Sequence, residues 1–395
     1  MECFQRVFVG NGRSLVWPNA RCARYLSQES NIEKHKPKTG ILLLNMGGPQ
    51  TVNDVPDYLL RIMTDRNLIQ LPMQRFLGPY IAKKRTAEVQ KKYEEIGGGS
   101  PILKWTQKQG NGLVERLDTA SPSTAPHKYY VAFRYANPLT DETMRQIEKD
   151  QLDHLVVFSQ YPQFSCATSG SSFDAIYHYF RKRQVPANMK WTVIDRWPTH
   201  SLLCQCIADR IKTELNFFPV EEQKDVVLLF SAHSLPLKAV KRGDSYPYEV
   251  GATVQAVMET MKYSNPYAIT WQSKVGPVPW LEPATEDAIK GFHKRGLKNF
   301  ILVPIAFTNE HIETLHELDI EYGKDLVKEL GGKITIRRAA APNDHKLFLD
   351  CLADIVETAV KADERVTNKF LSRCPKCTNR SCQPYKSFFA KVCQK

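Results

Sequence analysis

The sequence predicts an α/β protein made of two similar halves, each with a doubly wound parallel sheet. Short apolar runs alternate with segments of helical periodicity, which is typical of β-α-β units. The pattern starts again near the middle of the chain: ILLLNMGGP (41–49) resembles VVLLFSAHSLP (226–236), and HLVVFSQYPQFS (154–165) resembles FILVPIAFTNEH (300–311). We therefore expect two domains facing a cleft, 36–195 and 196–365, with a single larger sheet as the alternative.

Each half is expected to hold four strands, bounded by turn residues or helical segments. The expected strands are 38–45, 129–135, 154–160 and 191–195, then 224–230, 268–272, 300–307 and 334–338. The expected helices include 51–66, 82–95, 140–151, 171–183, 199–215, 246–263, 284–294, one that follows Asn309, and 344–363.

The composition excludes several classes of protein. The chain has 395 residues, 42% of them hydrophobic, but no apolar run approaches the 18 residues of a membrane-spanning helix. The net charge of +12 is concentrated at the ends, because 366–395 holds seven Lys or Arg residues and no acidic residue. A nearly neutral body disfavours a nucleic-acid partner. The strand at 38–45 is followed by Met-Gly-Gly-Pro, which matches no nucleotide-binding fingerprint.

The first 35 residues are typical of a mitochondrial transit peptide and linker. They contain Arg6, Arg13, Arg21 and Arg24, with Glu2 as the only acid before Glu29. We expect cleavage near 24–27; the alternative is an N-terminus without a targeting role.

Four carboxylates follow the strand at 300–307, namely Glu310, Glu313, Glu317 and Glu321. At about 100° per residue they would form one stripe of a helix. Like charges at this spacing repel, and the carboxyl ends of strands hold the ligands of open α/β sheets. The stripe therefore indicates a cation site or a proton path, with a solvated acidic face as the alternative.

His233 directly follows an apolar strand and is flanked by Ser231 and Ser234. Imidazole accepts protons near neutral pH, although a lone histidine is more often structural. Further side chains end or follow other strands and can line the same cleft: Met46, Arg134, Tyr135, Trp280 and Phe307. An apolar, aromatic cavity with a base and carboxylates suits a large flat ligand and a divalent cation.

The segment 68–81 is apolar and is followed by Lys83, Lys84 and Arg85. We call 68–81 the lip, because apolar side chains edged by cations suit contact with an anionic bilayer. An ordinary helix–loop–helix packed inside the protein is the alternative.

The C-terminal tail, 366–395, contains Cys374, Cys377 and Cys382 in a C-x2-C-x4-C pattern. A soft metal site would take its fourth ligand from Cys166 or Cys393. The spacing alone favours zinc over a [2Fe–2S] cluster, and cysteines without a ligand role are the third possibility. Cys204, Cys206 and Cys351 lie in apolar helical segments and are expected in the core.

Several of these motifs together resemble the ferrochelatase family: RYANP with Arg134, YPQFSCATSGSS with Cys166, SAHSLP with His233, GPVPWLEP with Trp280, and VPIAFTNEHIETLHELDIEY with Glu313. The resemblance runs from Lys38 to Phe389, and the leader and cysteine tail are similar to those of animal mitochondrial members. It implies the insertion of Fe²⁺ into protoporphyrin IX with release of two protons, two Rossmann-like halves of the chelatase fold, a homodimer, and peripheral attachment to the matrix side of the mitochondrial inner membrane. It also reverses the zinc preference, since Cys166, Cys374, Cys377 and Cys382 match the family's [2Fe–2S] ligands.

The resemblance also implies roles for the residues of the cleft. His233 would accept a pyrrole proton and Glu313 would assist, while Glu310, His311, Glu317 and Glu321 would guide protons or the cation. The expected porphyrin contacts are Met46, Arg85, Tyr93, Ser100, Arg134, Tyr135, Trp280 and Phe307. Glu310 stands where the family often has Asp, and Cys393 matches no family role. A porphyrin carrier without turnover and a cobalt or nickel chelatase are the rival functions.

Overall fold

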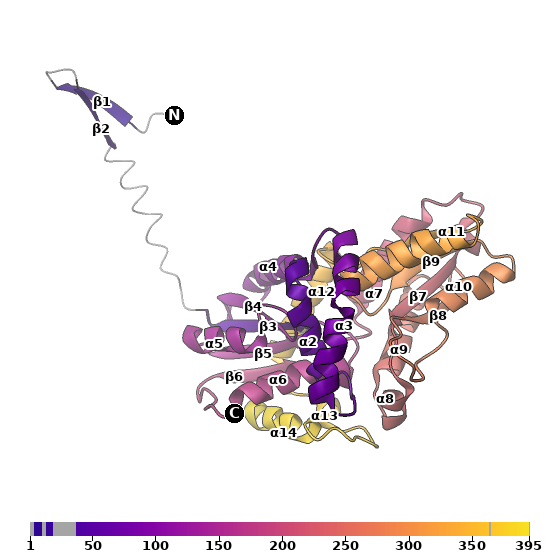
Figure 1. The fold of residues 1–395 in the computed structure, drawn as a ribbon. Helices are drawn as coiled ribbons and strands as arrows, with labels where there is room; N and C mark the ends of the chain where they lie inside the picture. The colour runs from indigo at the N-terminus through magenta and orange to yellow at the C-terminus, as the bar shows by residue number, and fades with distance from the viewer. Residues whose placement is uncertain (1–3, 10–12, 19–36, 363–364, 395) are drawn as a thin grey trace.

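The computed structural model describes residues 4–9, 13–18, 37–362 and 365–394. Within these ranges, two four-stranded parallel sheets are flanked by helices (Figure 1). The first sheet contains β3 (Thr39–Asn45), β4 (His127–Phe133), β5 (His154–Ser159) and β6 (Lys190–Ile194). The second contains β7 (Val227–His233), β8 (Tyr267–Gln272), β9 (Asn299–Pro304) and β10 (Thr335–Arg338). The predicted two-sheet α/β fold is confirmed, and the single larger sheet is excluded.

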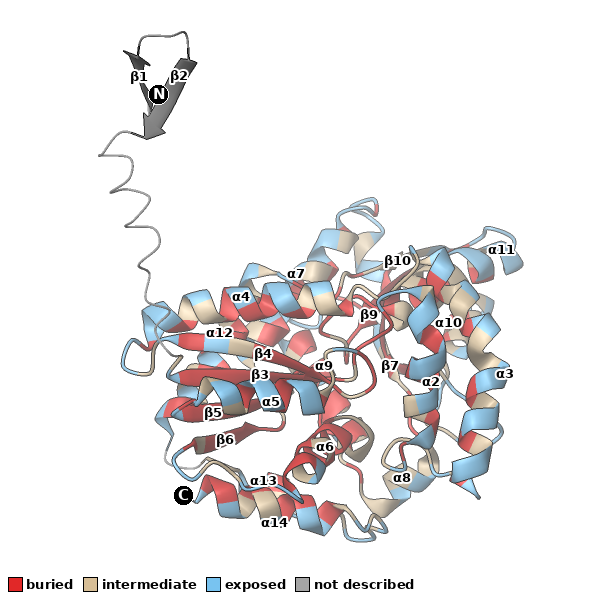
Figure 2. Cartoon of the chain, turned by 60° about the vertical axis from the view of Figure 1, so that its left-hand side comes forward, coloured by how far each residue is buried: buried red, intermediate tan, exposed pale blue. Residues whose placement is uncertain are grey.

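The two sheets have the same strand order. The first runs β4-β3-β5-β6, and the second, read in the matching direction, runs β8-β7-β9-β10. In both, the first strand of the half lies between the second and the third. The sequence likeness noted above therefore pairs β3 with β7 and β5 with β9, which are the central strands of each sheet. These strands are buried almost throughout, as their continuous apolar runs predict (Figure 2).

Helices fill the connections, as expected. In the first half they are α2 (Val55–Thr64), α3 (Gln74–Glu95), α4 (Ile102–Ala120), α5 (Thr140–Asp150) and α6 (Ser171–Phe180). In the second half and tail they are α7 (Ser201–Leu215), α8 (Leu237–Arg242), α9 (Tyr246–Thr260), α10 (Thr285–Lys294), α11 (Val327–Glu329), α12 (Lys346–Lys361), α13 (Asn368–Leu371) and α14 (Cys382–Cys393).

Two helices differ from the expectation. The helix expected at 82–95 begins at Gln74, because the Gln74 amide donates to the carbonyls of Met63 and Ile69 and anchors the earlier start. Gly78 lets α3 cross α2 closely, since a Cβ there would lie 2.7 Å from the Met63 carbonyl oxygen.

The helix after Asn309 is a π-helix, η4 (Glu313–Leu326). A cap at Asn309 predicts that the helix begins at Glu310, three residues before the observed start of η4. A second, short π-helix, η2 (Cys166–Gly170), carries Cys166.

The halves share one large core that includes residues of both sheets, such as Ile41, Val156, Leu228 and Ile301. Helix α12 belongs to the second half in sequence but packs on α4 and β6 of the first. Cys204, Cys206 and Cys351 are buried in this core, which confirms the expectation.

The predicted transit peptide lies mostly outside the described residues, including its cleavage zone at 24–27. Within it the structure describes two strands, β1 (Phe4–Val9) and β2 (Arg13–Pro18), which pair antiparallel. No helix of the described residues is long and apolar enough to cross a membrane.

Candidate active site

The expected site residues gather where the strand order of each sheet reverses. Such a switch point lies at the carboxyl ends of the first and third strands of each half, where doubly wound sheets bind ligands. In the second sheet, His233 ends β7, and Phe307 and His311 follow β9. In the first sheet, Met46 follows β3 and Tyr161 follows β5. The repeated topology thus supplies two sets of site residues, one from each half.

His233 is held in one tautomer by the chain itself. Its Nδ1 lies 2.6 Å from the carbonyl oxygen of Ser234, which can only accept, so Nδ1 carries the hydrogen. In the neutral ring, Nε2 therefore has a free lone pair. The ring lies beside Trp280, with centroids 6.3 Å apart. Trp280 is fixed in turn by a strand bridge to Pro236 and by donation from its Nε1 to the Val275 carbonyl.

Glu313 and Glu317 are joined through the residues that end β8. Gln272 is the register partner of His233, and its Nε2 donates to the Glu313 carbonyl and to Glu317 Oε2, both at 3.0 Å. The Ser273 hydroxyl lies 3.4 Å from Glu313 Oε2 and also donates to Glu317. Ser273 holds φ at 62°, a conformation that is uncommon outside glycine and is often found at functional sites. His233 and the two carboxylates thus lie at the carboxyl ends of β7 and β8.

Burial and neighbouring charge shift the pKa values of Glu317 and of the tyrosines near Glu313. Burial, and then the charge of Glu313, raise the pKa of Glu317. Four buried tyrosines surround Glu313, and burial together with its charge raises the pKa of each of them: Tyr58, Tyr93, Tyr161 and Tyr246. They come from α2, α3, the segment after β5, and α9, so Glu313 lies between the halves.

The other carboxylates of the predicted stripe have different surroundings. Glu310 precedes η4. Burial opposes its ionisation, but Arg338, 2.8 Å away, together with hydrogen bonds from Thr314 and the Ala341 backbone, outweighs burial, and the pKa of Glu310 is lowered. Glu321 pairs with Lys92 of α3 at 2.8 Å and with His316 at 3.1 Å. Of these four carboxylates, only Glu313 and Glu317 share hydrogen-bond donors. Glu313, Glu317 and Glu321 lie on η4, which is a π-helix rather than the expected α-helix.

His311 lies between Phe307 and Glu313. Its Nε2 is 4.0 Å from Glu313 Oε1, and its Nδ1 is 3.0 Å from the Asn309 carbonyl oxygen. The rings of Phe307 and His311 are 4.7 Å apart between centroids. The structure therefore brings these two expected residues to Glu313.

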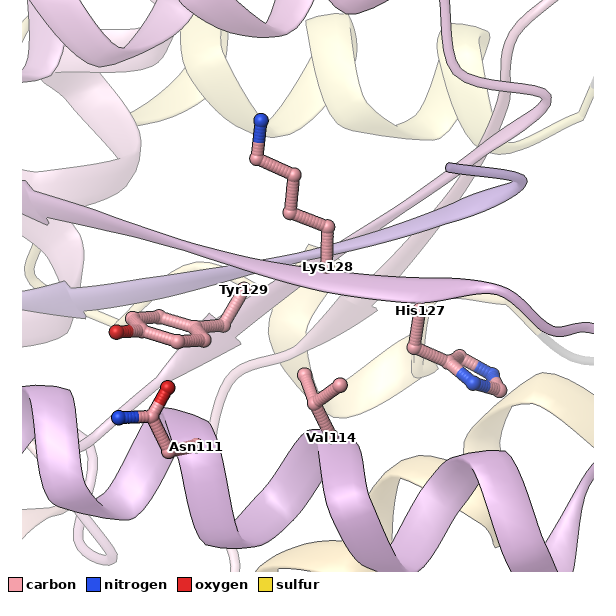
Figure 3. A pocket seen from close by; sticks show the side chains of 5 residues that line it. All are labelled: Asn111, Val114, His127, Lys128 and Tyr129. Carbon is pink, nitrogen blue, oxygen red and sulfur yellow. The ribbon is translucent and has the colours of Figure 1, made fainter. Parts of the chain in front are cut away.

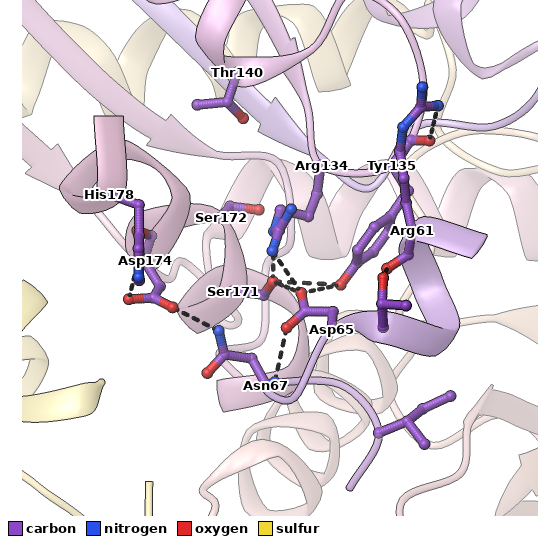
Figure 4. Close-up of polar contacts among 12 residues, drawn as sticks. Arg61, Asp65, Asn67, Arg134, Tyr135, Thr140, Ser171, Ser172, Asp174 and His178 are labelled. Carbon is purple, nitrogen blue, oxygen red and sulfur yellow. Dashed lines mark hydrogen bonds and ion pairs between the residues drawn. The ribbon is translucent and has the colours of Figure 1, made fainter. Parts of the chain in front are cut away.

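Arg134 forms an ion pair with Asp65, at the C-terminal end of α2, and Tyr135 donates a hydrogen bond to the same carboxylate (Figure 4). Arg134 Nη2 and the Tyr135 hydroxyl lie 3.0 and 2.8 Å from Asp65 Oδ2, and Ser171 of α6 donates to the same oxygen at 2.5 Å. This buried carboxylate fixes the orientation of both predicted porphyrin contacts.

The remaining expected contacts line the first-half side. Tyr93 is almost fully buried beside Glu313, and Met46 lies against the tyrosine-rich end of the first sheet. Ser100 packs closely on the turn after β3. A Cβ on Gly48 of this turn would lie only 2.5 Å from Ser100 Oγ. Arg85 is half-buried on α3, eight residues before Tyr93.

Two cavities help to delimit the site. One of about 400 Å³ lies between α4 and the start of β4, lined by Asn111, Val114, His127, Lys128 and Tyr129 (Figure 3). It lies at the amino end of β4, and both ring nitrogens of His127 are occupied, by Asp118 and Thr124. A smaller cavity of about 160 Å³ adjoins the carboxyl ends of β3 and β4. Only the smaller one lies on the side of the predicted site.

The four predicted cluster cysteines come from two facing segments. Cys166 and Cys374 share a hydrogen bond, which, together with the nearby Lys386, lowers the pKa of Cys374 to about 6. Cys377 and Cys382 interact with each other, and Arg373 reaches both. Four thiols with basic neighbours are the donor set that a [2Fe–2S] cluster needs. Within the described residues, however, no three His, Cys, Asp or Glu side chains converge closely enough to hold a metal ion.

The sequence did not indicate Asp65, the tyrosines Tyr58, Tyr161 and Tyr246, or the Gln272–Ser273 pair. Gln272 and Ser273 could have been found, because they end a strand just as His233 does. Asp65 and Tyr58 belong to a helix and its end, and nothing in their local pattern points to the cleft.

Comparisons with known proteins show the family of this chain. The family model described as Ferrochelatase matches residues 38–360. Among curated relatives, "Ferrochelatase, mitochondrial" of Drosophila melanogaster is 61% identical over 92% of this chain and 94% of its own. The protein of the same description from Homo sapiens is 56% identical over 90% of this chain and 84% of its own. A solved structure, SirB from Bacillus subtilis with Fe³⁺, aligns with 82% of this chain and 96% of its own, at 10% identity and a TM-score of 0.47.

The two α/β halves and the family match define a chelatase. The chain belongs to the ferrochelatase family, of the animal mitochondrial type. It is a lyase of haem biosynthesis, inserts Fe²⁺ into protoporphyrin IX, and is mitochondrial.

Proposed function

We propose that His233 is the base of this insertion reaction and that Nε2 accepts a pyrrole proton. The observation that carries this proposal is the Nδ1–H bond to the Ser234 carbonyl, which leaves Nε2 as the acceptor of the neutral ring. Each turnover consumes one Fe²⁺ and one porphyrin, forms protohaem and releases two protons, one from each pyrrole N–H group. No electron is transferred.

The released protons leave through Glu313 and Glu317. Ser273 contacts both carboxylates, and the raised pKa of Glu317 makes this group a better proton acceptor than an ordinary glutamate. His311 adjoins Glu313 and extends the same path, whereas Glu321 stands at the outer end near Lys92. Glu310 supports the start of η4 through Arg338 and Asn343, and guides the cation only by its charge.

Porphyrin is held by side chains of both halves. Trp280 and Phe307 offer aromatic faces beside His233 and His311, and Met46 and Tyr93 lie opposite. Arg134 and Tyr135 are oriented by Asp65, while Arg85 and Ser100 are placed to address a propionate. A cavity that bends the macrocycle would expose its nitrogen lone pairs, which is distortion toward the transition state.

The protein attaches peripherally to the matrix side of the inner membrane through its lip. Met73 and Phe76 are each 73% exposed and Tyr80 is 65% exposed, in a row along the start of α3. The exposed cations Arg75, Lys83 and Lys84 lie on the same helix. This arrangement suits an anionic lipid surface.

Cys166, Cys374, Cys377 and Cys382 would hold a [2Fe–2S] cluster, with three ligands from the tail and one from η2. Such a cluster would cross-link the tail to the body, and since insertion transfers no electrons its role would be structural or sensing. The proposed homodimer rests on family membership, and sedimentation velocity of the purified chain tests it.

Anaerobic incubation of the purified protein with protoporphyrin IX and Fe²⁺, and separately with Zn²⁺, tests the function. We expect metalloporphyrin bands to appear catalytically with both metals. A carrier would quench porphyrin fluorescence without product, and a cobalt or nickel chelatase would reject protoporphyrin in favour of a more acidic tetrapyrrole.

A further inference from the structure

Residues 374–382, here called the cysteine loop, contact both sides of the molecule near the start of the lip. On the first-half side, Asn379 Nδ2 donates to Asn67 Oδ1 at 2.7 Å. On the second-half side, Arg242 donates through Nη1 to Thr378 Oγ1 at 2.9 Å, and its carbonyl accepts from Lys376 N at 3.2 Å. The loop therefore bridges the α2–α3 connection and the end of α8.

The first contact leads directly to a predicted porphyrin side chain. Asn67 donates from its backbone N to Asp65 Oδ1 at 2.8 Å and from Nδ2 to Asp174 Oδ2 at 2.7 Å (Figure 4). Asp65 then holds Arg134 and Tyr135 through its other oxygen. The cysteine loop is thus linked to Arg134 through two intervening residues, Asn67 and Asp65.

The second contact leads toward the base. Arg242 is the last residue of α8, which begins at Leu237, four residues after His233. Its Nη1 also lies 3.4 Å from Gln70 Oε1, in the lip. Gly243 follows with φ at 102°, and a Cβ there would lie 2.7 Å from Pro375 Cδ. The cysteine loop therefore packs directly against the backbone of Gly243, where a side chain would not fit. Three segments therefore meet: the α2–α3 connection, the end of α8, and the cysteine loop.

We propose that Asn67, Arg242 and Asn379 form a positioning junction by which the cysteine loop sets the geometry of the porphyrin site. The proposal deepens the function given above and rests on it. The three residues do not touch the reacting atoms; they act through Asp65 on Arg134 and through Gln70 on the lip. Porphyrin affinity then depends on whether the cysteine loop is in place, while the proton chemistry at His233 does not.

Asn379→Asp separates this role from folding of the tail. Asn379 Oδ1 accepts from Ser381 N at 2.9 Å and shapes the turn before Cys382, and an aspartate keeps that acceptor. It loses only the Nδ2 donor and places an acceptor opposite Asn67 Oδ1. Gln383→Glu is the matched control, because it adds the same charge to an exposed tail residue whose amide bonds only to Ser387 of its own helix.

We expect Asn379→Asp to raise the KM for protoporphyrin about three- to tenfold, which is the value of one lost hydrogen bond. The kcat and the visible bands per chain should stay at wild-type levels, and hydrogen exchange of 65–73 should accelerate about fivefold. Gln383→Glu should match wild type in all four measurements. Wild-type KM and exchange in Asn379→Asp would overturn the junction, as would a KM change accompanied by loss of the visible bands. If the wild-type protein fails to metallate porphyrin, the proposed function fails, and the exchange measurement still decides whether the junction exists.

Discussion

At the scale of single residues, the proposed chemistry depends on a tautomer set by the backbone. Because Ser234 contributes the carbonyl that fixes His233, the proposed base is oriented by its own neighbour rather than by a carboxylate. The orientation therefore survives changes elsewhere in the cleft.

Replacing His233 by Ala should lower turnover about 100-fold or more, since a positioned base contributes on this order. Porphyrin should still bind, because Trp280 is held by Pro236 and Val275. Product formation and porphyrin fluorescence quenching are measured together. Turnover above a tenth of wild type would remove His233 from the base role.

Glu317 should make stability fall as the pH rises. Its folded-state pKa is raised, first by burial and then by Glu313, so the folded state binds the proton more tightly than the unfolded state. This contribution is present below the ordinary glutamate pKa, near 4.5, and is lost as the pH rises through the raised value. Urea unfolding at a series of pH values should show a steeper decline for wild type than for Glu317→Gln. Equal pH slopes for the two proteins would contradict this prediction.

His233 and Glu313 could be predicted as candidate site residues because they stand at or after the carboxyl ends of buried strands. In any doubly wound sheet these ends lie along the same side. It could not lead to Asp65, whose partners Arg134 and Ser171 are 69 and 106 residues away in the chain. Tertiary packing decides which helix end contacts which strand end, so these contacts cannot be predicted from the spacing of residues in the sequence.

At the scale of elements, the lip consists of the end of the α2–α3 connection, 68–73, and the start of α3, 74–81. The apolar run at 68–81 left open whether these side chains pack inside or face out. The structure divides them: Gln74 and Gly78 face α2, whereas Met73, Phe76 and Tyr80 are exposed.

Changing Phe76 and Tyr80 together to Ser should reduce flotation with cardiolipin-containing liposomes, because two exposed aromatic anchors are lost. Turnover on detergent-dispersed porphyrin should change little. Phe217→Ser is the control, since Phe217 is also exposed, at 64%, but lies against Arg337 of β10. Equal flotation of the double variant and the control would count against the lip.

The periodicity of the sequence did not predict that η4 is a π-helix. A pattern read at 100° per residue assumed an α-helix, whereas a π-helix has bonds from residue i to i+5. Tyr322, five residues after Glu317, donates to it at 3.1 Å. The contacts of η4 are with segments far away in the chain: Leu318 packs with Phe300 of β9, and Glu321 pairs with Lys92 of α3.

At the scale of the whole molecule, the tail packs into the core of the first half and also contacts the second half. Phe370, Tyr385 and Phe389 join the core around Phe173, while Lys369 and Lys386 reach Glu249 and Phe164. A cluster would therefore strengthen packing that the tail already makes.

Cys166→Ser should abolish the visible bands and lower the melting temperature, since ligation free energy contributes to assembly. Absorption spectra and thermal unfolding measure both effects. Cys393→Ser is the control, because Cys393 lies buried at the end of α14, apart from the four ligands. Loss of colour in Cys393→Ser with colour kept in Cys166→Ser would reverse the ligand assignment.

The placement of α12 also has a consequence for the order in which the chain acquires structure. A protein that enters its compartment N-terminus first presents β3 to β6 long before 346–361 arrives to cover them. Contacts of such long range form slowly, and until they form the apolar face of the first sheet stays open to aggregation. Import of this chain should therefore depend on chaperones that hold the first half until its last helices have passed through.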